Sequence, residues 1–435
     1  MKNIYIETYG CQMNFSDTEI LSAILKDGGF GFTETPDNAD FILLNTCSIR
    51  ENAEDRIFKR LQNLKKYKKS NKNLKFGVLG CMAERLQEKL SASGEVSLVV
   101  GPDEYRKLPE LIESINGDGA GIAVNLEAME TYNDVTPLRT DDISAWLSIM
   151  RGCNNFCTYC VVPYTRGRER SRSSADLLAE VERLAAAGYK ELTFLGQNVN
   201  SYLCPVDNIR FADLLDSAAR TAPEMRLRFI TSHPRDMSEK LIDTIAIHKN
   251  ICNHIHLPVQ SGSDSMLANM KRKYNSSGYL KLIGSIRNAI PDAAITTDII
   301  AGFPGETNDD HKATLDLIKE VRFDGAFMFR YSAREGTAAY KLNDDVPEEE
   351  KIRRLNEIIH LQQDISKQIN KYEHDKIFEI LVENPSKRNP AEWQGRTDTN
   401  KVVIFPNENC SERGHLVRVK IIRSTAATLF GELVI

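Results

Sequence analysis

The fold is decided by one short stretch, Cys153-Asn154-Asn155-Phe156-Cys157-Thr158-Tyr159-Cys160, with the spacing C-x3-C-x2-C. It follows an apolar run, residues 143–150, that predicts a strand. Three thiolates are one too few for a closed tetrahedral zinc site, and they leave one iron of a 4Fe–4S cube without a protein ligand. An iron left open in this way can bind a substrate or a cofactor.

This spacing resembles that of the radical S-adenosylmethionine (SAM) superfamily. In that superfamily the open iron chelates the amino and carboxylate groups of SAM, and reduction releases a 5′-deoxyadenosyl radical. The chain has only 9 cysteines among 435 residues, so a chance cluster at this spacing is the weaker explanation.

Composition bounds the class of protein. A length of 435 residues predicts about two to four domains, and 41% hydrophobic with 27% charged residues is ordinary for a globular protein. We expect no membrane span, because no run of about 18 apolar residues occurs. The odd number of cysteines and the lack of a secretory signal predict a cytoplasmic protein with thiolates on metal. The net charge of −5 leaves nucleic-acid binding to local patches.

Three regions differ in pattern. Residues 1–119 alternate strands (4–9, 41–45, 76–79, 98–100) with helical segments (17–26, 51–69), which predicts a parallel α/β domain. A polar linker, 120–140, follows. Residues 141–371 hold six strand-like runs, 146–150, 192–195, 227–230, 255–259, 295–300 and 326–331, with helical patterns between them and a long closing helix at 347–370.

Six βα units are too few for a closed eight-stranded barrel and suit the open, partial (β/α)6 barrel of the radical SAM superfamily. Residues 372–435 change to short strands, 377–382, 402–404, 417–422 and 429–434, punctuated by turn residues. That pattern predicts a small all-β barrel.

A second group of cysteines lies in the first region. Cys11, Cys47 and Cys81 each follow a predicted strand, and the carboxyl ends of parallel strands form one ligand-binding edge. They are either small buried residues or the ligands of a second cube with an open iron, and the downstream triplet favours the cube. Cys204, Cys252 and Cys410 have no partner spacing and are interpreted as structural.

Five segments carry a closer resemblance. Residues 9–14 (YGCQMN), 45–55 (NTCSIRENAED), 80–83 (GCMA), 161–172 (VVPYTRGRERSR) and 395–401 (GRTDTNK) are similar to the methylthiotransferases, and most of all to the tRNA-modifying MiaB type. The resemblance covers the whole chain in order. It implies a methylthiotransferase domain, a radical SAM domain and a C-terminal TRAM barrel.

The resemblance also implies an activity, the 2-methylthiolation of N6-isopentenyladenosine beside the tRNA anticodon. Two 4Fe–4S clusters would be held by the six cysteines, two SAM molecules would be consumed per turnover, and no catalytic side chain beyond the cluster ligands is expected. The partners would be a tRNA anticodon stem-loop, an electron donor such as flavodoxin or ferredoxin, and a sulfur source. We expect a monomer.

SAM contacts are expected in the loops that follow the barrel strands. By similarity to related enzymes these are Tyr159 in the cysteine loop, Gln197 and Asn198 after the second strand, Gln260 and Ser261 after the fourth, and Asp298 and Gly302 of the fifth-strand motif. Arg272 is a candidate partner for a carboxylate, because a guanidinium binds carboxylates bidentately.

RNA contacts require cations near phosphate. The segment after the cysteine loop offers Arg166, Arg168, Arg170 and Arg172, and the alternative is a solvated charge run. The C-terminal barrel, residues 372–435, has 9 Lys plus Arg against 9 Asp plus Glu, so only a local patch of Trp393, Arg396, Asn400 and Lys401 is a candidate there.

Alternatives to this function remain. The same chemistry modifies an aspartate of a ribosomal protein, or threonylcarbamoyladenosine in tRNA, in related enzymes. A non-catalytic Fe–S RNA-binding regulator is the alternative of a different class. It would leave the six βα units and the SAM-type loops without a purpose.

Overall fold

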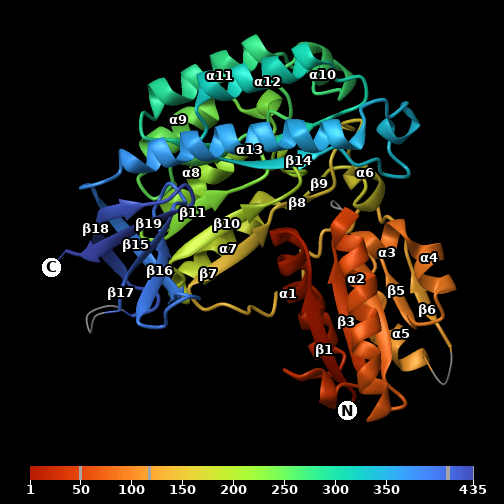
Figure 1. The fold of residues 1–435 in the computed structure, drawn as a ribbon. Helices are drawn as coiled ribbons and strands as arrows, with labels where there is room; N and C mark the ends of the chain where they lie inside the picture. The colour runs from red at the N-terminus through yellow and green to blue at the C-terminus, as the bar shows by residue number, and fades with distance from the viewer. Residues whose placement is uncertain (49–50, 116–118, 408–411, 435) are drawn as a thin grey trace.

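The computed structural model of the chain describes residues 1–48, 51–115, 119–407 and 412–434. Cys410 therefore lies outside the described residues, as do Ile49 and Arg50 of the second family segment. Figure 1 shows an N-terminal α/β unit (red to orange) and a C-terminal barrel (blue), each placed against the larger central unit. Within the residues that the structure describes, no helix combines the length and apolar character needed to cross a membrane.

The N-terminal unit is a six-stranded parallel sheet in the order β2-β1-β3-β4-β5-β6. Its strands are β1 (Asn3–Thr8), β2 (Gly31–Phe32), β3 (Phe41–Thr46), β4 (Lys75–Gly80), β5 (Leu98–Val100) and β6 (Gly121–Ala123). Its helices are α1 (Gln12–Asp27), α2 (Glu51–Leu64), α3 (Cys81–Arg85), α4 (Gln87–Ala92) and α5 (Leu108–Ser114). Every residue of β3 is buried, as expected of an apolar strand covered by helices on both faces.

The central unit has six parallel strands: β7 (Ser144–Ser148), β10 (Glu191–Leu195), β11 (Arg226–Phe229), β12 (His254–His256), β13 (Ala294–Ala301) and β14 (Gly325–Arg330). A parallel bridge between Leu227 and Ile251 joins the two three-stranded halves. The predicted partial barrel is therefore confirmed. The predicted first strand divides at Ile149 into β7 and β8 (Met150–Arg151), and β8 pairs with β9 (Arg170–Ser171) across the cysteine loop.

Helices cover the outer face of this half-barrel (Figure 1). They are α7 (Ser174–Ala186), α8 (Phe211–Thr221), α9 (Glu239–Ile247), α10 (Asp264–Asn269), α11 (Ser276–Ala289), α12 (Asn308–Val321) and α13 (Glu348–Lys371). The short helix α6 (Val162–Thr165) follows the cysteine loop and contacts α3 of the N-terminal unit. Side-chain oxygens of Ser173, Ser238, Ser263, Asn275 and Thr307 accept backbone N–H groups at their N-termini. Such caps satisfy donors that a helix leaves unpaired and fix where it begins.

The C-terminal unit is a closed five-stranded barrel in the order β15-β16-β17-β19-β18. Its strands are β15 (Ile377–Pro385), β16 (Glu392–Arg396), β17 (Val402–Pro406), β18 (Leu416–Ser424) and β19 (Thr428–Leu433). Arg226 and Arg228 of β11 dock it by donating to backbone carbonyls of residues 379 and 396–398. The prediction missed β16, which lacks an apolar alternation.

Candidate active site

Cys11, Cys47 and Cys81, the upstream triad, follow three adjacent strands of the N-terminal sheet. Cys11 is the N-cap of α1 just beyond β1, Cys47 directly follows β3, and Cys81 is the first residue of α3 directly after β4. The three strands are hydrogen-bonded neighbours in this order. Their carboxyl ends therefore bring residues that are far apart in sequence to one edge of the sheet.

Two glycines make this approach possible. Gly10 has φ +128°, and a Cβ on it would lie 2.4 Å from the Cβ of Cys47. Gly80 has φ +86°, and its Cβ would meet the carbonyl oxygen of Thr46 at 2.7 Å. Any other residue would combine an unfavourable backbone conformation with a collision at the site.

The thiols of the upstream triad have different environments. A hydrogen bond with Cys47 lowers the pKa of Cys11 to about 6, although burial opposes the shift. Burial raises the pKa of Cys81, although the nearby guanidinium of Arg166 favours its thiolate. Arg166 donates from Nε to the Cys81 sulfur at 3.2 Å.

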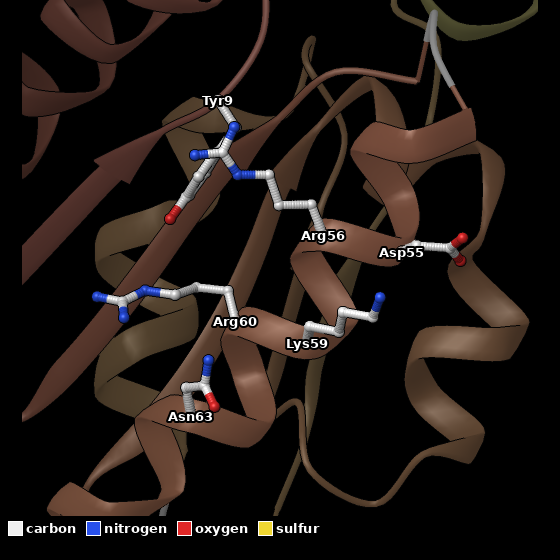
Figure 2. A pocket seen from close by; sticks show the side chains of 6 residues that line it. All are labelled: Tyr9, Asp55, Arg56, Lys59, Arg60 and Asn63. Atoms are coloured by element: carbon white, nitrogen blue, oxygen red, sulfur yellow. The ribbon is translucent and has the colours of Figure 1, made fainter.

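A basic groove of about 590 Å³ lies beside Tyr9, two residues before Cys11. Its lining comprises Tyr9, Asp55, Arg56, Lys59, Arg60 and Asn63. Figure 2 shows Arg56 extending over Tyr9, and its guanidinium carbon lies 5.5 Å from the ring centroid. Arg60 forms an ion pair with Glu7, with Nε 2.9 Å from a carboxylate oxygen. None of the predicted site residues lines this groove.

Cys153, Cys157 and Cys160, the downstream triad, lie in the loop after β8. Gly152 has φ +77°, and a Cβ on it would lie 2.0 Å from the carbonyl oxygen of Arg168, so the loop folds tightly at its start. Burial raises the pKa of Cys153 to about 11 and that of Cys160 to about 12. Thiols held in this way lose their protons when they bind a metal.

Arg272 stands against the downstream triad. Its Nη1 lies 3.4 Å from the Cys157 sulfur and 3.4 Å from the hydroxyl of Tyr159, while Nη2 donates to the carbonyl of Pro258 at 2.7 Å. The side chain is almost fully buried. Two predicted cofactor residues, Tyr159 and Arg272, are thus in direct contact with each other, and Arg272 also contacts Cys157.

The other predicted SAM residues lie at the strand ends with different partners. Gln197 accepts the Gly152 N–H at 2.5 Å and so holds the cysteine loop, whereas Asn198 donates to Asp236 at 2.7 Å. The buried Oδ1 of Asn198 has no hydrogen-bond partner in the described part of the chain. An amide oxygen left in this way is suited to a polar ligand.

The loop after the fourth strand, β12, lies against the fifth strand, β13. Gln260 has φ +72° and donates its backbone N–H to the carbonyl of Asp298 at 2.8 Å. Ser261 is buried against the hydroxyl of Thr314 at 3.2 Å. Asp298 lies 3.5 Å from the ring of His256. The backbone of Asp298 therefore joins the loop after β12 to strand β13.

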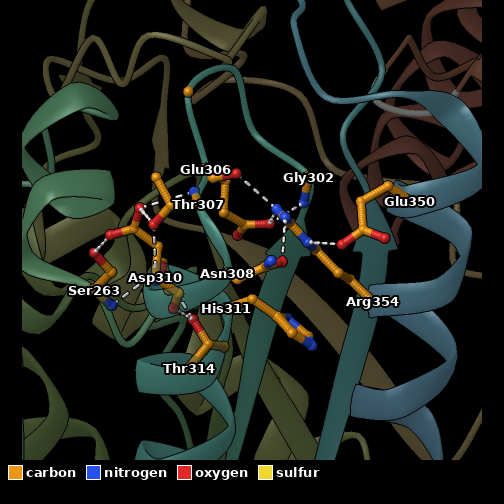
Figure 3. Close-up of polar contacts among 12 residues, drawn as sticks. Ser263, Gly302, Glu306, Thr307, Asn308, Asp310, His311, Thr314, Glu350 and Arg354 are labelled. Atoms are coloured by element: carbon orange, nitrogen blue, oxygen red, sulfur yellow. Dashed lines mark hydrogen bonds and ion pairs between the residues drawn. The ribbon is translucent and has the colours of Figure 1, made fainter.

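The fifth-strand motif is fixed by a polar network (Figure 3). Glu306 accepts the Gly302 N–H at 2.7 Å and pairs with Arg354 of α13 at 2.9 Å. A Cβ on Gly302 would lie 2.3 Å from Cγ of Lys351, so α13 packs directly against this glycine. The closing helix therefore sets the position of the loop that is expected to contact the cofactor.

A buried ion network joins the N-terminal and central units. Arg151 and Arg166 donate to Asp17 at 2.9 Å and 2.7 Å, and Arg170 donates to both oxygens of Asp103 at 2.9 Å. Burial disfavours ionisation of Asp17, yet the two guanidiniums hold its pKa below the usual range. Removing one partner of such a buried pair typically costs about 3–5 kcal/mol. The network therefore fixes the two cysteine triads relative to each other.

This network corrects one expectation. The arginine run suggested four guanidiniums available to phosphate, but Arg166, Arg170 and Arg172 are buried against carboxylates, because Asp17, Asp103 and Glu180 face them across the fold. Arg168 alone of the four is exposed, and it stacks 5.1 Å from the ring centroid of Phe156.

The four residues of the predicted RNA-binding patch on the C-terminal barrel do not all face solvent. Trp393 packs against the barrel core, and its indole N–H finds no acceptor among the described residues. Lys401 is drawn inward to Glu373 at 2.9 Å and Asp324 at 3.3 Å. Arg396 keeps 38% of its side chain exposed, 3.6 Å from Glu383, and Asn400 adopts φ +65° in a turn.

Both triads offer the donor set of an iron–sulfur cluster, which cysteine thiolates hold. Over the described residues, no three His, Cys, Asp or Glu side chains converge as ligands of a single metal ion. Gly10, Gly80 and Gly152 let the segments that carry the cysteines approach neighbouring chain more closely than a Cβ would allow. The donor chemistry of three thiols at each triad fits one cube at each.

Three family models match the chain in order. Residues 3–101 match Uncharacterized protein family UPF0004, residues 147–318 match the Radical SAM superfamily and residues 372–434 match the TRAM domain. Among solved structures, the radical SAM methyltransferase TsrM from Kitasatospora setae aligns with a TM-score of 0.55 at 14% identity, over 76% of this chain and 75% of that one. This likeness concerns the fold.

Full-length relatives are much closer in sequence. A protein of Chloroherpeton thalassium is 52% identical over 430 residues, 98% of this chain and 95% of its own length. A protein of Porphyromonas gingivalis is 49% identical over 441 residues, 100% of this chain and 95% of its own length. Both are named tRNA-2-methylthio-N(6)-dimethylallyladenosine synthase.

The half-barrel and its cysteine loop define a radical SAM enzyme, and its cofactors are 4Fe–4S clusters and SAM. The high identity over the full length then settles the family. The chain belongs to the radical SAM methylthiotransferases of the tRNA-2-methylthio-N(6)-dimethylallyladenosine synthase type.

Proposed function

We propose that the chain adds a methylthio group to carbon 2 of N6-isopentenyladenosine (dimethylallyladenosine) beside the tRNA anticodon. The observation that carries the proposal is the presence of two three-cysteine sites in two domains, fixed to each other by a buried ion network. A single radical site would account for breaking a C–H bond. The second site accounts for delivery of sulfur.

The chemistry requires this division of labour. Carbon 2 of adenine has an unactivated C–H bond that no side-chain base removes at neutral pH. When bound, the downstream cluster with SAM would supply a carbon radical for hydrogen abstraction, and the upstream cluster would hold the sulfur that a first SAM methylates. Such chemistry needs a site that excludes water.

The residues of the chain prepare the downstream site. Arg272 places a permanent positive charge on Cys157 and shares a hydrogen bond with Tyr159. Gln197 fixes the start of the cysteine loop through Gly152. Cys153 and Cys157 are buried, and burial of the thiols keeps water from the reacting groups.

We propose individual side chains as the SAM contacts. Tyr159 lies in the cysteine loop, Arg272 lies between α10 and α11, and Asp298 lies within β13. The others, in loops that follow barrel strands, are Gln197, Asn198, Gln260, Ser261 and Gly302. The unpartnered Oδ1 of Asn198 supports a polar contact there. The six cysteines are proposed as the cluster ligands.

For the tRNA, we propose contacts on exposed cations near each of the two triads and on the C-terminal barrel. Arg168 is exposed beside the downstream loop, and the Arg56–Tyr9 pair offers a cation and a ring in the groove beside Cys11. Cations bind phosphate and aromatic rings stack on bases. Arg396 is the exposed cation of the barrel patch.

The remaining partners follow from the reaction. An electron donor such as flavodoxin or ferredoxin would reduce the downstream cluster, and a sulfur source would restore the upstream site after each turnover. We propose that the enzyme acts as a monomer in the cytoplasm, where tRNA is modified. Two SAM molecules would be used for each methylthio group.

The test is a reconstitution assay. The full chain is loaded with iron and sulfide, then given reductant, SAM and an isopentenylated anticodon stem-loop, and the nucleosides are analysed by mass spectrometry. A 2-methylthio nucleoside together with 5′-deoxyadenosine supports the proposal. Release of 5′-deoxyadenosine with an unchanged nucleoside would assign another substrate, such as a ribosomal protein aspartate or threonylcarbamoyladenosine. Intact clusters with no SAM cleavage would favour a non-catalytic RNA-binding regulator.

A further inference from the structure

Arg166 belongs to the radical SAM domain by sequence but reaches into the cysteine site of the N-terminal domain. Its side chain is only 3% exposed. Nε donates to the Cys81 sulfur at 3.2 Å, and Nη2 donates to Asp17 at 2.7 Å. Its Nη1 is buried and has no hydrogen-bond partner among the residues that the structure describes.

An unpartnered buried guanidinium nitrogen calls for an acceptor. Leaving a charged donor unsatisfied costs several kcal/mol in a protein interior, so such groups are usually paired with protein, water or a ligand. The other guanidiniums of the network do pair their terminal nitrogens: Arg151 with Asp17 and a backbone carbonyl, and Arg170 with Asp103 and Arg166.

The local charge also favours an anionic acceptor beside Arg166. The hydrogen-bonded network holds three guanidiniums, those of Arg151, Arg166 and Arg170, against two carboxylates, those of Asp17 and Asp103. Within this set one positive charge is left over, and it lies beside a cysteine site. Three thiolates outweigh the charge of an oxidised cube, so a loaded upstream triad would be anionic and complementary to this excess.

We propose that Arg166 is a positioning residue for the upstream site, which holds Cys81 through Nε and donates from Nη1 to an anionic sulfur atom bound there. This inference rests on the proposed function, because it takes the upstream triad to hold a cluster. It assigns the acceptor class as thiolate or sulfide sulfur. It also makes the radical SAM domain a contributor to the sulfur site.

The test uses the full chain with Cys153, Cys157 and Cys160 all changed to alanine, so that only the upstream cluster can form. Its reduction potential is measured in this background and in the added variants Arg166→Gln, Arg166→Lys and Arg170→Gln. Hydrogen bonds and positive charge near the sulfurs raise the potential of an iron–sulfur cluster. Arg170 is the matched control, because it is buried in the same network but touches no cysteine.

We expect Arg166→Gln to make the potential more negative and Arg166→Lys to restore part of the shift. Arg170→Gln removes a charge from the same network but no hydrogen bond to a sulfur, so its shift should be smaller despite a lower unfolding temperature. An unchanged potential in Arg166→Gln, with a loss of thermal stability equal to that of Arg170→Gln, would overturn the proposal. If Arg166→Gln does not hold a cluster, the reduction potential of Arg166→Lys is compared with that of the parent. A more negative potential in Arg166→Lys supports the proposal, and an equal potential overturns it.

Methanethiol serves as a small sulfur probe of the Nη1 contact. The parent should change its cluster spectrum at a lower methanethiol concentration than Arg166→Gln does, and equal concentrations would overturn the contact. These readouts do not involve tRNA. A potential shift without any methylthiolated nucleoside would therefore refute the proposed function alone, and a methylthiolated nucleoside without a shift would refute this inference alone.

Discussion

Arg272 places its Nη1 3.4 Å from the sulfur of Cys157, although 115 residues separate the two in the chain. Arg166 has the same relationship to Cys81 in the other domain, at 3.2 Å. In each cysteine triad, a buried guanidinium thus lies within hydrogen-bonding distance of one sulfur. A fixed positive charge beside the sulfur complements the negative charge of a cysteine-bound cluster.

Arg272→Gln should slow SAM cleavage. The substitution removes the charge-assisted contacts to Cys157 and Tyr159. The loss of one such contact is worth about 1.5–3 kcal/mol, or about 10- to 150-fold in a binding or rate constant. The measurement is the rate of 5′-deoxyadenosine formation at a series of SAM concentrations. Arg353→Gln, on the exposed face of α13, is the control. Equal rates in the two variants would show that Arg272 has no part in SAM cleavage.

Gly10→Ala should remove the upstream cluster and spare the downstream one. The added Cβ would overlap the Cβ of Cys47 at 2.4 Å, and the backbone is held at φ +128°. Gly29→Ala is the control, since φ is +82° there but no atom lies within 4 Å of the added Cβ. Both variants should lose about 1 kcal/mol or more of stability from backbone strain.

Iron analysis separates the two glycine variants. Gly10→Ala should bind about half the iron of the parent after reconstitution, and Gly29→Ala should bind the full amount. Full iron in Gly10→Ala would mean that the upstream triad does not require the close approach of these two strands.

Acid should destabilise the metal-free protein below pH 6.5, partly through His254. Burial lowers the pKa of His254 to about 3, whereas the unfolded chain takes up this proton near pH 6.5. The stabilisation is therefore complete above pH 6.5 and is lost as the pH falls towards 3. At pH 5 the loss is about 2 kcal/mol.

Chemical unfolding at pH 7 and pH 5 checks this dependence. His254→Gln should flatten it by about 2 kcal/mol, and His360→Gln, at an exposed position of α13, should leave it as in the parent. A parent and His254→Gln variant with the same pH dependence would contradict the account. Burial of His233 lowers its pKa to about 2, so it should supply part of the dependence that remains.

The sequence predicted the order of the three units because strand and helix periodicities are local signals. It missed β2 and β6 at the edges of the first sheet, since two or three residues show no period, and β16, where Trp393 and Gly395 break the alternation. The strand ends also predicted that Cys11, Cys47 and Cys81 would share one edge. Parallel strands place their carboxyl ends at one edge whatever their order in the sheet.

The electrostatic part of the site could not be predicted in the same way. The partners Asp17 and Asp103 lie 149 and 67 residues from the arginines that they bind, Arg166 and Arg170. Only the packing of one domain on the other brings them together. The arginine run therefore predicted a solvent-facing phosphate site, whereas three of its four side chains turn inward.

The most direct test of the central claim compares three single variants in the stem-loop assay. The claim is that each triad holds its own cluster and that the two clusters perform different steps. Cys47→Ala should keep 5′-deoxyadenosine formation and lose the methylthiolated nucleoside, Cys157→Ala should lose both products, and Cys252→Ala, a buried cysteine outside both triads, should lose neither. A methylthiolated nucleoside from Cys47→Ala at the parental rate would contradict the account.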